Sequence, residues 1–189
     1  GSHFGKIHFH VWLYVSRARG LPVSILMLLY AGADYHSVFA FAAYCLMTVV
    51  YLGLGSNLGD RKLNLLKAVD ALQALDCLSH VRLSQIIETA PVGGPQQGDY
   101  LNAVVECHCS VSAIHLLEQV QIVERQLKRQ RLGKNHPRTI DVDILLFGDE
   151  SHTSDALTVP HPRMHQREFV MRPLAEFLPE YCANATANI

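Results

Sequence analysis

Hydrophobic and polar residues follow periods along most of the chain that predict a mixture of strands and helices. Four segments are rich in apolar and β-branched residues over the length of a strand: 48–54, 81–88, 100–109 and 139–147. Two segments repeat apolar residues every three or four positions, as one face of a helix does: 61–75 and 114–127. Ser112 stands just before the second helix and is a typical N-cap.

The order of these segments is β-α-β-β-α-β, which predicts an α+β fold with a ferredoxin-like core and an antiparallel sheet. Prolines and glycines exclude regular structure over 89–99, and a basic run fills 128–137. After the last strand we expect a C-terminal extension made of loops and one short helix near 173–177.

The composition changes near residue 47. Residues 1–46 contain only four charged side chains, and their apolar stretches show no clean period. The apolar stretch 21–33 is too short to span a bilayer alone, and a membrane anchor or signal-like segment is one interpretation of this region. We favour another, in which Met47 begins the domain. Residues 1–46 are then an apolar extension outside a catalytic domain of residues 47–189.

Charge and cysteine content narrow the class of protein. The formal net charge is -1, so no overall field favours nucleic acid or a membrane surface as partner. The five cysteines show neither C-x-x-C nor zinc-site spacing, which is typical of reduced thiols. We therefore expect a cytoplasmic protein that binds no nucleic acid and is not a membrane protein.

Two carboxylates interrupt the last predicted strand, which lies in PRTIDVDILLFG, residues 137–148. Side chains on a strand alternate between faces, so Asp141 and Asp143 share one face, about 7 Å apart along the strand. The opposite face is apolar and has the composition of a core: Ile140, Val142, Ile144 and Leu146. A cation between the carboxylates would offset their repulsion, and two carboxylates suit Mg²⁺, which takes further ligands from water and substrate phosphates. An edge strand with a solvated polar face is the plainer alternative.

A basic run directly precedes this pair: Lys128, Arg129, Arg131, Lys134 and Arg138. Cations beside a metal site indicate a polyphosphate, because arginine binds phosphate oxygens bidentately and Mg²⁺ bridges them. Taken alone, the run would be a solvated loop. Gln121 and Glu124 share one face of the preceding helix, and they either reach a nucleotide or are solvated.

Hydrogen-bond donors and one aromatic ring follow in LTVPHPRMHQREF, residues 157–169: Thr158, His161, Arg167 and Phe169. His161 and His165 have the spacing of a helical zinc pair, but the two prolines beside them exclude a helix, so we reject zinc. The glycine turn GLGSNLGD, residues 53–60, matches neither the P-loop nor the dinucleotide-binding motif. We interpret it as a tight turn into the first helix that could also contact substrate.

Four stretches occur in order and together resemble the hydroxymethyldihydropterin pyrophosphokinases of folate biosynthesis: YLGLGSNLGDR, DYLNAVV, PRTIDVDILLFG and LTVPHPRMHQREFV. The resemblance covers about residues 47–180. It implies a ferredoxin-like α+β fold, a monomer or homodimer, and transfer of pyrophosphate from ATP to the hydroxymethyl group of a reduced pterin, with release of AMP. ATP and the pterin are the implied partners, and two Mg²⁺ ions that arrive with ATP are the implied cofactor.

The resemblance also implies roles for individual residues. The metal ligands would be Asp141 and Asp143, within a catalytic set of Arg129, Arg138, Asp141 and Asp143. The ATP site would comprise Gln121, Glu124, Arg131, Arg138, Thr158, His161 and Arg167. Two rings would stack on the pterin, since stacking suits a flat heterocycle. The pterin site would comprise Thr89, Val92, Tyr100, Asn102 and Phe169, of which Tyr100 and Phe169 supply those rings.

Departures from the family pattern leave two alternatives open. Asn135 and His136 stand where tryptophan and glycine often precede P-R-T, and Pro162 follows His161 in place of an aromatic residue. An inactive or truncated relative is therefore one alternative. A ferredoxin-like nucleic-acid-binding module that uses the basic loop and the aromatic residues is the other. It leaves the two aspartates unexplained, because acidic side chains repel phosphates without a metal.

Overall fold

A five-stranded antiparallel sheet is the centre of the fold. The computed structural model describes residues 47–130 and 136–187. Within them, the strands are β1 (Thr48–Ser56), β2 (Leu78–Leu83), β3 (Ile87–Thr89), β4 (Tyr100–Cys109) and β5 (Asp141–Phe147). The order is β2-β4-β1-β5, with β3 also paired to β4, and every pair is antiparallel. The predicted combination of helices with an antiparallel sheet is confirmed.

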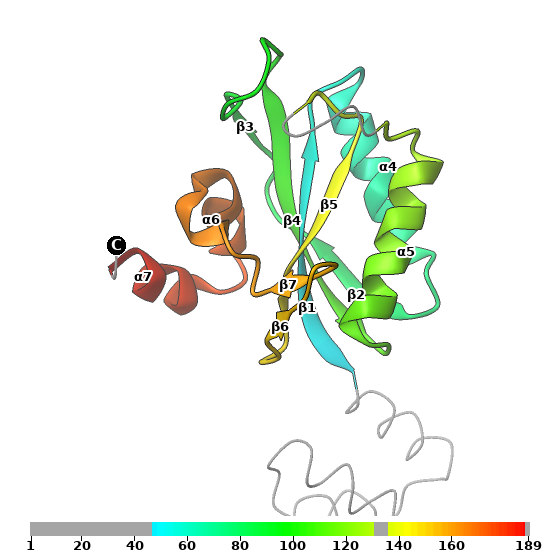
Figure 1. Cartoon of the computed structure of the whole chain (residues 1–189), viewed down its shortest axis with the longest axis vertical. Helices are drawn as coiled ribbons and strands as arrows, with labels where there is room; N and C mark the ends of the chain where they lie inside the picture. The colour runs from blue at the N-terminus through cyan, green and yellow to red at the C-terminus, as the bar shows by residue number, and fades with distance from the viewer. Residues whose placement is uncertain (1–46, 131–135, 188–189) are drawn as a thin grey trace, which may run out of the picture. The chain divides into compact units, whose positions relative to one another are not determined.

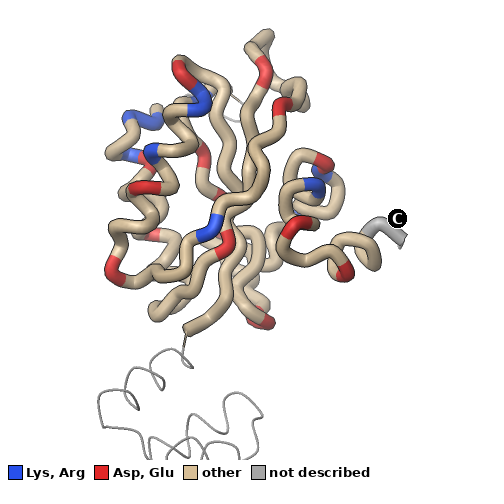
Figure 2. The backbone as a smooth tube through the Cα atoms, turned by 180° about the vertical axis from the view of Figure 1, so that it is seen from behind, with Lys and Arg blue, Asp and Glu red and all other residues tan. Residues whose placement is uncertain are grey.

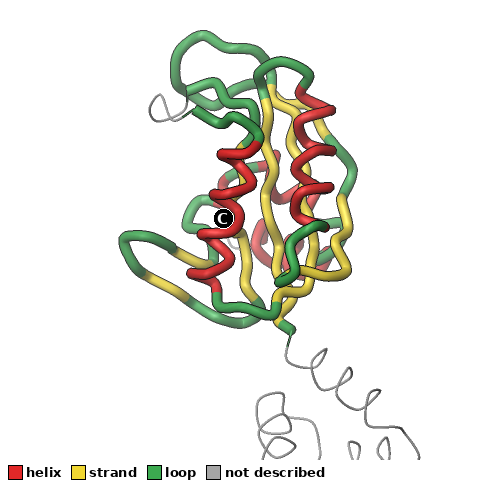
Figure 3. The backbone as a smooth tube through the Cα atoms, turned by 90° about the vertical axis from the view of Figure 1, so that its right-hand side faces the viewer, coloured by secondary structure: helices red, strands yellow, loops and turns green. Residues whose placement is uncertain are grey.

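Helices cover both faces of this sheet (Figure 1). Helices α4 (Arg61–Gln73) and α5 (Ala113–Gln126) lie side by side on one face, which Figure 3 shows from the front. Helices α6 (Glu168–Leu174) and α7 (Pro179–Ala187) lie on the other face. A small hairpin, β6 (His152–Thr153) and β7 (Thr158–Val159), and the 3₁₀ turn η1 (Met164–Gln166) connect β5 to α6.

Capping side chains explain where the first two helices begin. The Asp60 carboxylate accepts a hydrogen bond from Leu63 N at 3.0 Å, and the Ser112 hydroxyl accepts one from His115 N at 3.4 Å. The predicted Ser112 cap is therefore confirmed. Each helix buries one apolar stripe against the sheet: Leu65, Ala68, Val69 and Leu72 from α4, and Ala113, Leu116, Val120 and Val123 from α5.

Two hydrophobic cores lie on opposite sides of the sheet. The larger core joins α4 and α5 to inward residues of the strands, including Leu52, Val105 and Val142. The smaller core joins the other face to η1, α6 and α7, including Tyr51, Val104, Leu145, Met164 and Leu174. Asp141 and Asn102 lie at one end of the sheet, where β5 begins and where Gly55 of β1 pairs with both residues.

Three local expectations were wrong. The expected apolar face of β5 includes Leu146, but a register shift opposite Tyr51 and Leu52 turns Leu146 into the smaller core. The segment expected as one strand over 81–88 is two strands, because buried Ser84 breaks the pairing and hydrogen-bonds Val104 through its hydroxyl and its backbone N–H. The short helix expected near 173–177 is α6, which ends at Leu174, and α7 and the β6–β7 hairpin were not expected.

Charges of both signs are distributed over the described part of the chain. Figure 2 shows Lys and Arg positions interspersed with Asp and Glu positions along α4 and the loops near it. Four cysteines lie in this part: Cys182 and three free thiols, Cys77, Cys107 and Cys109. Among the described helices, none combines the length and the apolar character needed to cross a bilayer. The expected extension, residues 1–46, lies outside the described residues.

Candidate active site

Asp141 and Asp143 open strand β5 and point away from the larger core. Their strand neighbours Val142 and Ile144 are buried in that core, so alternation places both carboxylates on the opposite face. The antiparallel pairing sets Gly55 of β1 beside Asp141 and Gly53 beside Asp143. The shared face expected from the D-x-D spacing is therefore present.

Gly55 has no side chain and lies between two groups of polar side chains, so it forms a bare floor of backbone between them. It pairs with Asn102 on β4 and with Asp141 on β5. A Cβ atom at this position would lie 3.2 Å from Asn102 Oδ1, 3.9 Å from Tyr100 Cδ1 and 4.0 Å from Asp141 Cβ. The absence of a side chain keeps the space between the β4 groups and the β5 carboxylates open.

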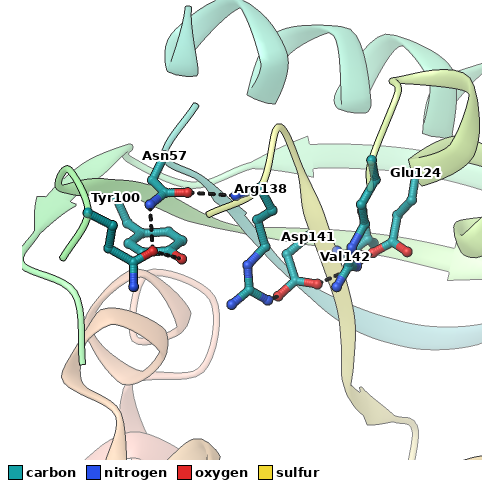
Figure 4. A network of polar contacts seen from close by, with 8 residues as sticks. Asn57, Tyr100, Glu124, Arg138, Asp141 and Val142 are labelled. Atoms are coloured by element: carbon teal, nitrogen blue, oxygen red, sulfur yellow. Dashed lines mark hydrogen bonds and ion pairs between the residues drawn. The ribbon is translucent and has the colours of Figure 1, made fainter. Parts of the chain in front are cut away.

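Two arginines pair with Asp141. Arg129 Nη1 contacts one carboxylate oxygen of Asp141, and Arg138 Nη1 donates a hydrogen bond to the other (Figure 4). Arg129 also pairs with Glu124, which is only 3 % exposed and accepts a hydrogen bond from Val142 N at 2.8 Å. Two guanidinium groups and two carboxylates thus neutralise one another in a partly buried cluster.

The charge balance at Asp143 is different. Burial and the neighbouring Asp141 charge raise the pKa of Asp143 to about 6, although Arg167 and Arg129 oppose the rise. A cation beside Asp143 would reverse this shift. Within residues 47–130 and 136–187, no group of three or more His, Cys, Asp or Glu side chains could hold a metal by itself. The donor set therefore fits an ion that brings most of its ligands with it.

A second basic group faces the same carboxylates from the segment before α6. Burial and the charge of Arg163 lower the pKa of Arg167, while the charges of Asp143 and Asp141 act in the opposite direction and raise it. Burial, Arg167 and Arg163 also lower the pKa of His161 below its ordinary value, so its imidazole is neutral at neutral pH. Arg167 and His161 thus place hydrogen-bond donors near the two aspartates, and an anion bound there could accept hydrogen bonds from them.

Three of the predicted pterin residues lie on β3 and β4, on the other side of Gly55: Thr89, Tyr100 and Asn102. Asn102 Nδ2 donates to Thr89 Oγ1 at 2.7 Å, and the Tyr100 ring lies 5.7 Å from the guanidinium carbon of Arg138. The Phe169 ring lies 5.5 Å from the guanidinium carbon of Arg167. Each ring expected to stack on the pterin is thus beside an arginine that interacts with the two aspartates.

Direct contacts or mutual electrostatic effects connect most of the predicted site residues: Thr89, Tyr100, Asn102, Glu124, Arg129, Arg138, Asp141, Asp143, His161, Arg167 and Phe169. None of the described contacts joins Gln121 or Thr158 to this set, and Val92 is 75 % exposed on its loop. Arg131 and Asn135 lie outside the described residues. The binding roles expected of all these residues stay predictions.

Sequence reasoning missed two residues at the centre of the site. Gly55 and Asn57 belong to GLGSNLGD, which we interpreted as a turn into the first helix that could contact substrate, without a role for either residue. Asn57 is buried and hydrogen-bonds both the loop before β4 and the backbone of Arg138. One signal in the sequence was available. Asn57 stands in a glycine turn but does not cap the following helix, because Asp60 is the N-cap of α4.

Comparison with known proteins gives consistent matches. The family model described as 7,8-dihydro-6-hydroxymethylpterin-pyrophosphokinase matches residues 51–179. A protein of Bacillus subtilis (strain 168) named 2-amino-4-hydroxy-6-hydroxymethyldihydropteridine pyrophosphokinase is 42% identical over 139 residues, covering 74% of this chain and 83% of the relative. A protein of the same name from Aquifex aeolicus (strain VF5) is 40% identical over 133 residues, covering 70% of this chain and 82% of the relative.

A solved structure described as HPPK-DHPS in complex with substrates resembles the chain in fold. The TM-score is 0.53 at 16% sequence identity, and the match covers 71% of this chain and 40% of that one. At this identity the likeness concerns the fold alone. The whole matched region contains the glycine turn, the carboxylate pair and the residues around them.

Proposed function

Because the chain belongs to the 7,8-dihydro-6-hydroxymethylpterin-pyrophosphokinase family, we infer that it transfers pyrophosphate from ATP to the hydroxymethyl group of 6-hydroxymethyl-7,8-dihydropterin and releases AMP. The reaction belongs to folate biosynthesis. The single observation that carries this conclusion is the family match over residues 51–179, which includes every described member of the candidate site. The function expected from the four sequence motifs is thereby confirmed.

We propose Asp141 and Asp143 as the ligands of Mg²⁺, held as two ions that arrive with ATP. The raised pKa of Asp143 supports this proposal, since a nearby cation favours the charged carboxylate. Two carboxylates alone also suit Mg²⁺, which usually keeps water and phosphate ligands. When bound, Mg²⁺ would neutralise charge on the phosphates.

The arginines supply the phosphate contacts in this proposal. Arg129 and Arg138 both pair with Asp141, so their guanidinium groups lie beside the proposed metal ligand. Planar guanidinium groups match the phosphate oxygens bidentately. Glu124 keeps Arg129 at the site through its own ion pair and its bond to Val142 N. Arg167 and His161 add donors, with Gln121, Arg131 and Thr158 as the remaining proposed ATP contacts.

The pterin binds on the β4 side of Gly55 in this proposal. Tyr100 and Phe169 would stack on the ring, Asn102 would hydrogen-bond its edge, and Thr89 and Val92 would offer backbone groups. Asn102 is buried and its amide already bonds Thr89, so its orientation is fixed before a ligand arrives. The bare floor at Gly55 leaves room for the hydroxymethyl group to approach the phosphates.

Transfer itself depends on positioning and charge. The hydroxyl oxygen of the pterin forms a bond to the β-phosphorus of ATP, and the bond from that phosphorus to the bridging oxygen breaks, so AMP leaves. The hydroxyl proton passes to a phosphate oxygen or to water. The guanidinium groups stabilise charge on the phosphate oxygens in a site where the protein dipoles are already oriented. None of these steps requires a side chain that acts as general base.

We also propose that the core is ferredoxin-like and that residues 47–189 form the catalytic domain. The order β2-β4-β1-β5, with α4 and α5 on one face, supports the first proposal. The family match over 51–179 supports the second. Neither proposal depends on the ion or on the arginine contacts.

A product assay tests the function. The protein is mixed with ATP, Mg²⁺ and 6-hydroxymethyl-7,8-dihydropterin, and the nucleotides are separated. We expect AMP only when the pterin is present, without ADP. ATP binding with no AMP would indicate an inactive relative, and the absence of any ATP binding would contradict the arginine and metal assignments.

A further inference from the structure

We propose that Asn57 is a positioning residue that couples the two halves of the active site, the pterin side and the phosphate side. The inference rests on the proposed function, because it assumes that both substrates occupy this site. It concerns the loop between β3 and β4, residues 90–99, and the segment that carries Arg138 into β5. Asn57 contacts both.

Asn57 lies between the end of β1 and the N-cap of α4 and is 7 % exposed. Its Nδ2 donates to Gln97 Oε1 at 2.9 Å and to Gly98 O at 3.3 Å. Its Oδ1 accepts from Arg138 N at 2.8 Å, and its backbone N donates to Arg138 O at 3.1 Å. One buried amide therefore joins segments that are about 40 and 81 residues away in the sequence.

The chemistry of these contacts requires an amide side chain. Gly98 O can only accept a hydrogen bond and Arg138 N can only donate one, so the orientation of the Asn57 amide is determined by its partners. An aspartate would keep the contact to Arg138 N but lose both donors, and an alanine would lose all three contacts. Because the group is buried, lost partners are not replaced readily by water.

At the phosphate side, Asn57 fixes the backbone that carries Arg138. The neighbouring Ser56 hydroxyl adds a hydrogen bond to Thr139 O at 2.5 Å. The Arg138 side chain extends from this fixed segment to Asp141 (Figure 4). A shift of the turn would therefore move the Arg138 guanidinium relative to the carboxylate and to a phosphate bound beside it.

At the pterin side, the same amide reaches Tyr100 through Gln97. The Tyr100 hydroxyl donates to Gln97 Oε1 at 3.0 Å, so Gln97 bridges Asn57 and the ring proposed to stack on the pterin. Gly93 and Gly94 in the same loop have positive φ values, which permit backbone conformations that other residues rarely adopt. A pterin that orders Tyr100 and Gln97 would thus also order Asn57 and Arg138.

Coupling of this kind is reciprocal, so each substrate should increase the affinity of the protein for the other. The experiment is titration calorimetry on the full chain with 6-hydroxymethylpterin and Mg²⁺·α,β-methylene-ATP, whose α–β link cannot be cleaved. The Kd of the pterin is measured without and with the nucleotide analogue. For the wild type we expect about 10-fold tighter pterin binding when the analogue is present.

The variant Asn57→Ala should reduce this ratio to about 2-fold or less, and it should lower kcat more than it raises either KM. Asn64→Ala is the matched control, because Asn64 Nδ2 donates from α4 to Ser56 Oγ and Leu58 O, and none of its described hydrogen bonds reaches the loop 90–99 or Arg138. The control should keep the wild-type ratio. A merely structural role of Asn57 would lower Tm and leave the ratio unchanged.

Gln97→Ala is the second variant and removes the bridge from the loop end, so it keeps the inference testable if Asn57→Ala does not fold. It should also reduce the ratio. A wild-type ratio in either folded variant, or a wild type with no coupling at all, would overturn the inference. A wild type that forms no pterin-dependent AMP would instead refute the proposed function, so the two failures are distinguishable.

Discussion

Single residues determine the chemistry at the end of the sheet, and Asp143 shows this most directly. Its D-x-D spacing predicted a shared face with Asp141, and the strand register confirms that expectation. Local sequence could not indicate that Arg129 and Arg138 would both pair with Asp141, because that depends on how a loop returns to the strand. The result is one carboxylate that is neutralised by arginines and one whose charge is unfavourable.

Asp143→Asn should lower the rate of AMP formation by at least about 100-fold, because an amide is a poor ligand for a hard cation. Steady-state rates at saturating Mg²⁺ measure the effect. Asp149→Asn is the control, since Asp149 is exposed just after β5 and should leave the rate unchanged. Equal rates for Asp143→Asn and the wild type would exclude Asp143 as a metal ligand.

The pKa of Asp143 predicts a pH-dependent effect on stability. The folded-state pKa is about 6, above the ordinary value of 3.8, so the folded state holds this proton more strongly than the unfolded state. The associated stability is present below pH 3.8 and is lost as pH rises through 6. In metal-free buffer, Asp143→Asn should therefore increase the free energy of unfolding above pH 6 but not near pH 3.8.

Urea unfolding of wild type and Asp143→Asn at several pH values measures this difference. The expected difference grows as pH rises from about 4 to about 6 and then becomes constant. A difference that does not depend on pH would contradict the unfavourable charge assigned to Asp143.

At the scale of elements, periodicity located the helices and most strands, but packing between strands determined where some strands break and which core some residues join. Ser112 and the apolar stripes of α4 and α5 were evident from local sequence, because caps and helical spacing are local signals. The break at Ser84 and the displaced Leu146 arise from pairing with β4 and β1, which no single segment encodes. The same pairing places Gly55 between the two halves of the site.

Gly55→Ala should reduce activity by about 10-fold with little change in Tm. The added Cβ would lie 3.2 Å from Asn102 Oδ1, so Asn102 must shift within the space where the substrates meet. Gly53→Ala is the matched control on the same strand, where the Cβ would meet Leu145 Cδ2 at 3.2 Å in the smaller core. Gly53→Ala should lower Tm and should reduce activity less than Gly55→Ala does. A larger loss of activity in Gly53→Ala than in Gly55→Ala would contradict the open space assigned to Gly55.

At the scale of the whole molecule, four motifs far apart in the sequence meet at one end of the sheet. The family and the reaction could be predicted because four short motifs carry the resemblance and occur in order along the chain. The connection through Asn57 could not be predicted, because its partners Gln97, Gly98 and Arg138 become neighbours only after the strands pair. Helix α7 was missed for a related reason, since short segments acquire their structure largely from the core that they cover.

The proposed domain boundary predicts that a chain of residues 47–189 folds and is active. We expect its kcat and KM values to agree with those of the full chain within about 2-fold, because the matched region begins at residue 51. Far-UV circular dichroism and the AMP assay check folding and activity separately. A folded but inactive fragment would show that residues 1–46 contribute to the site.

Phosphorus NMR of the products tests the central claim most directly. The wild-type protein is incubated with ATP, Mg²⁺ and 6-hydroxymethyl-7,8-dihydropterin, and the spectrum is recorded as the reaction proceeds. We expect one equivalent of AMP for each equivalent of a pterin ester that carries two mutually coupled phosphorus atoms. ADP with a pterin monophosphate, or orthophosphate released without any pterin product, would contradict pyrophosphate transfer at this site.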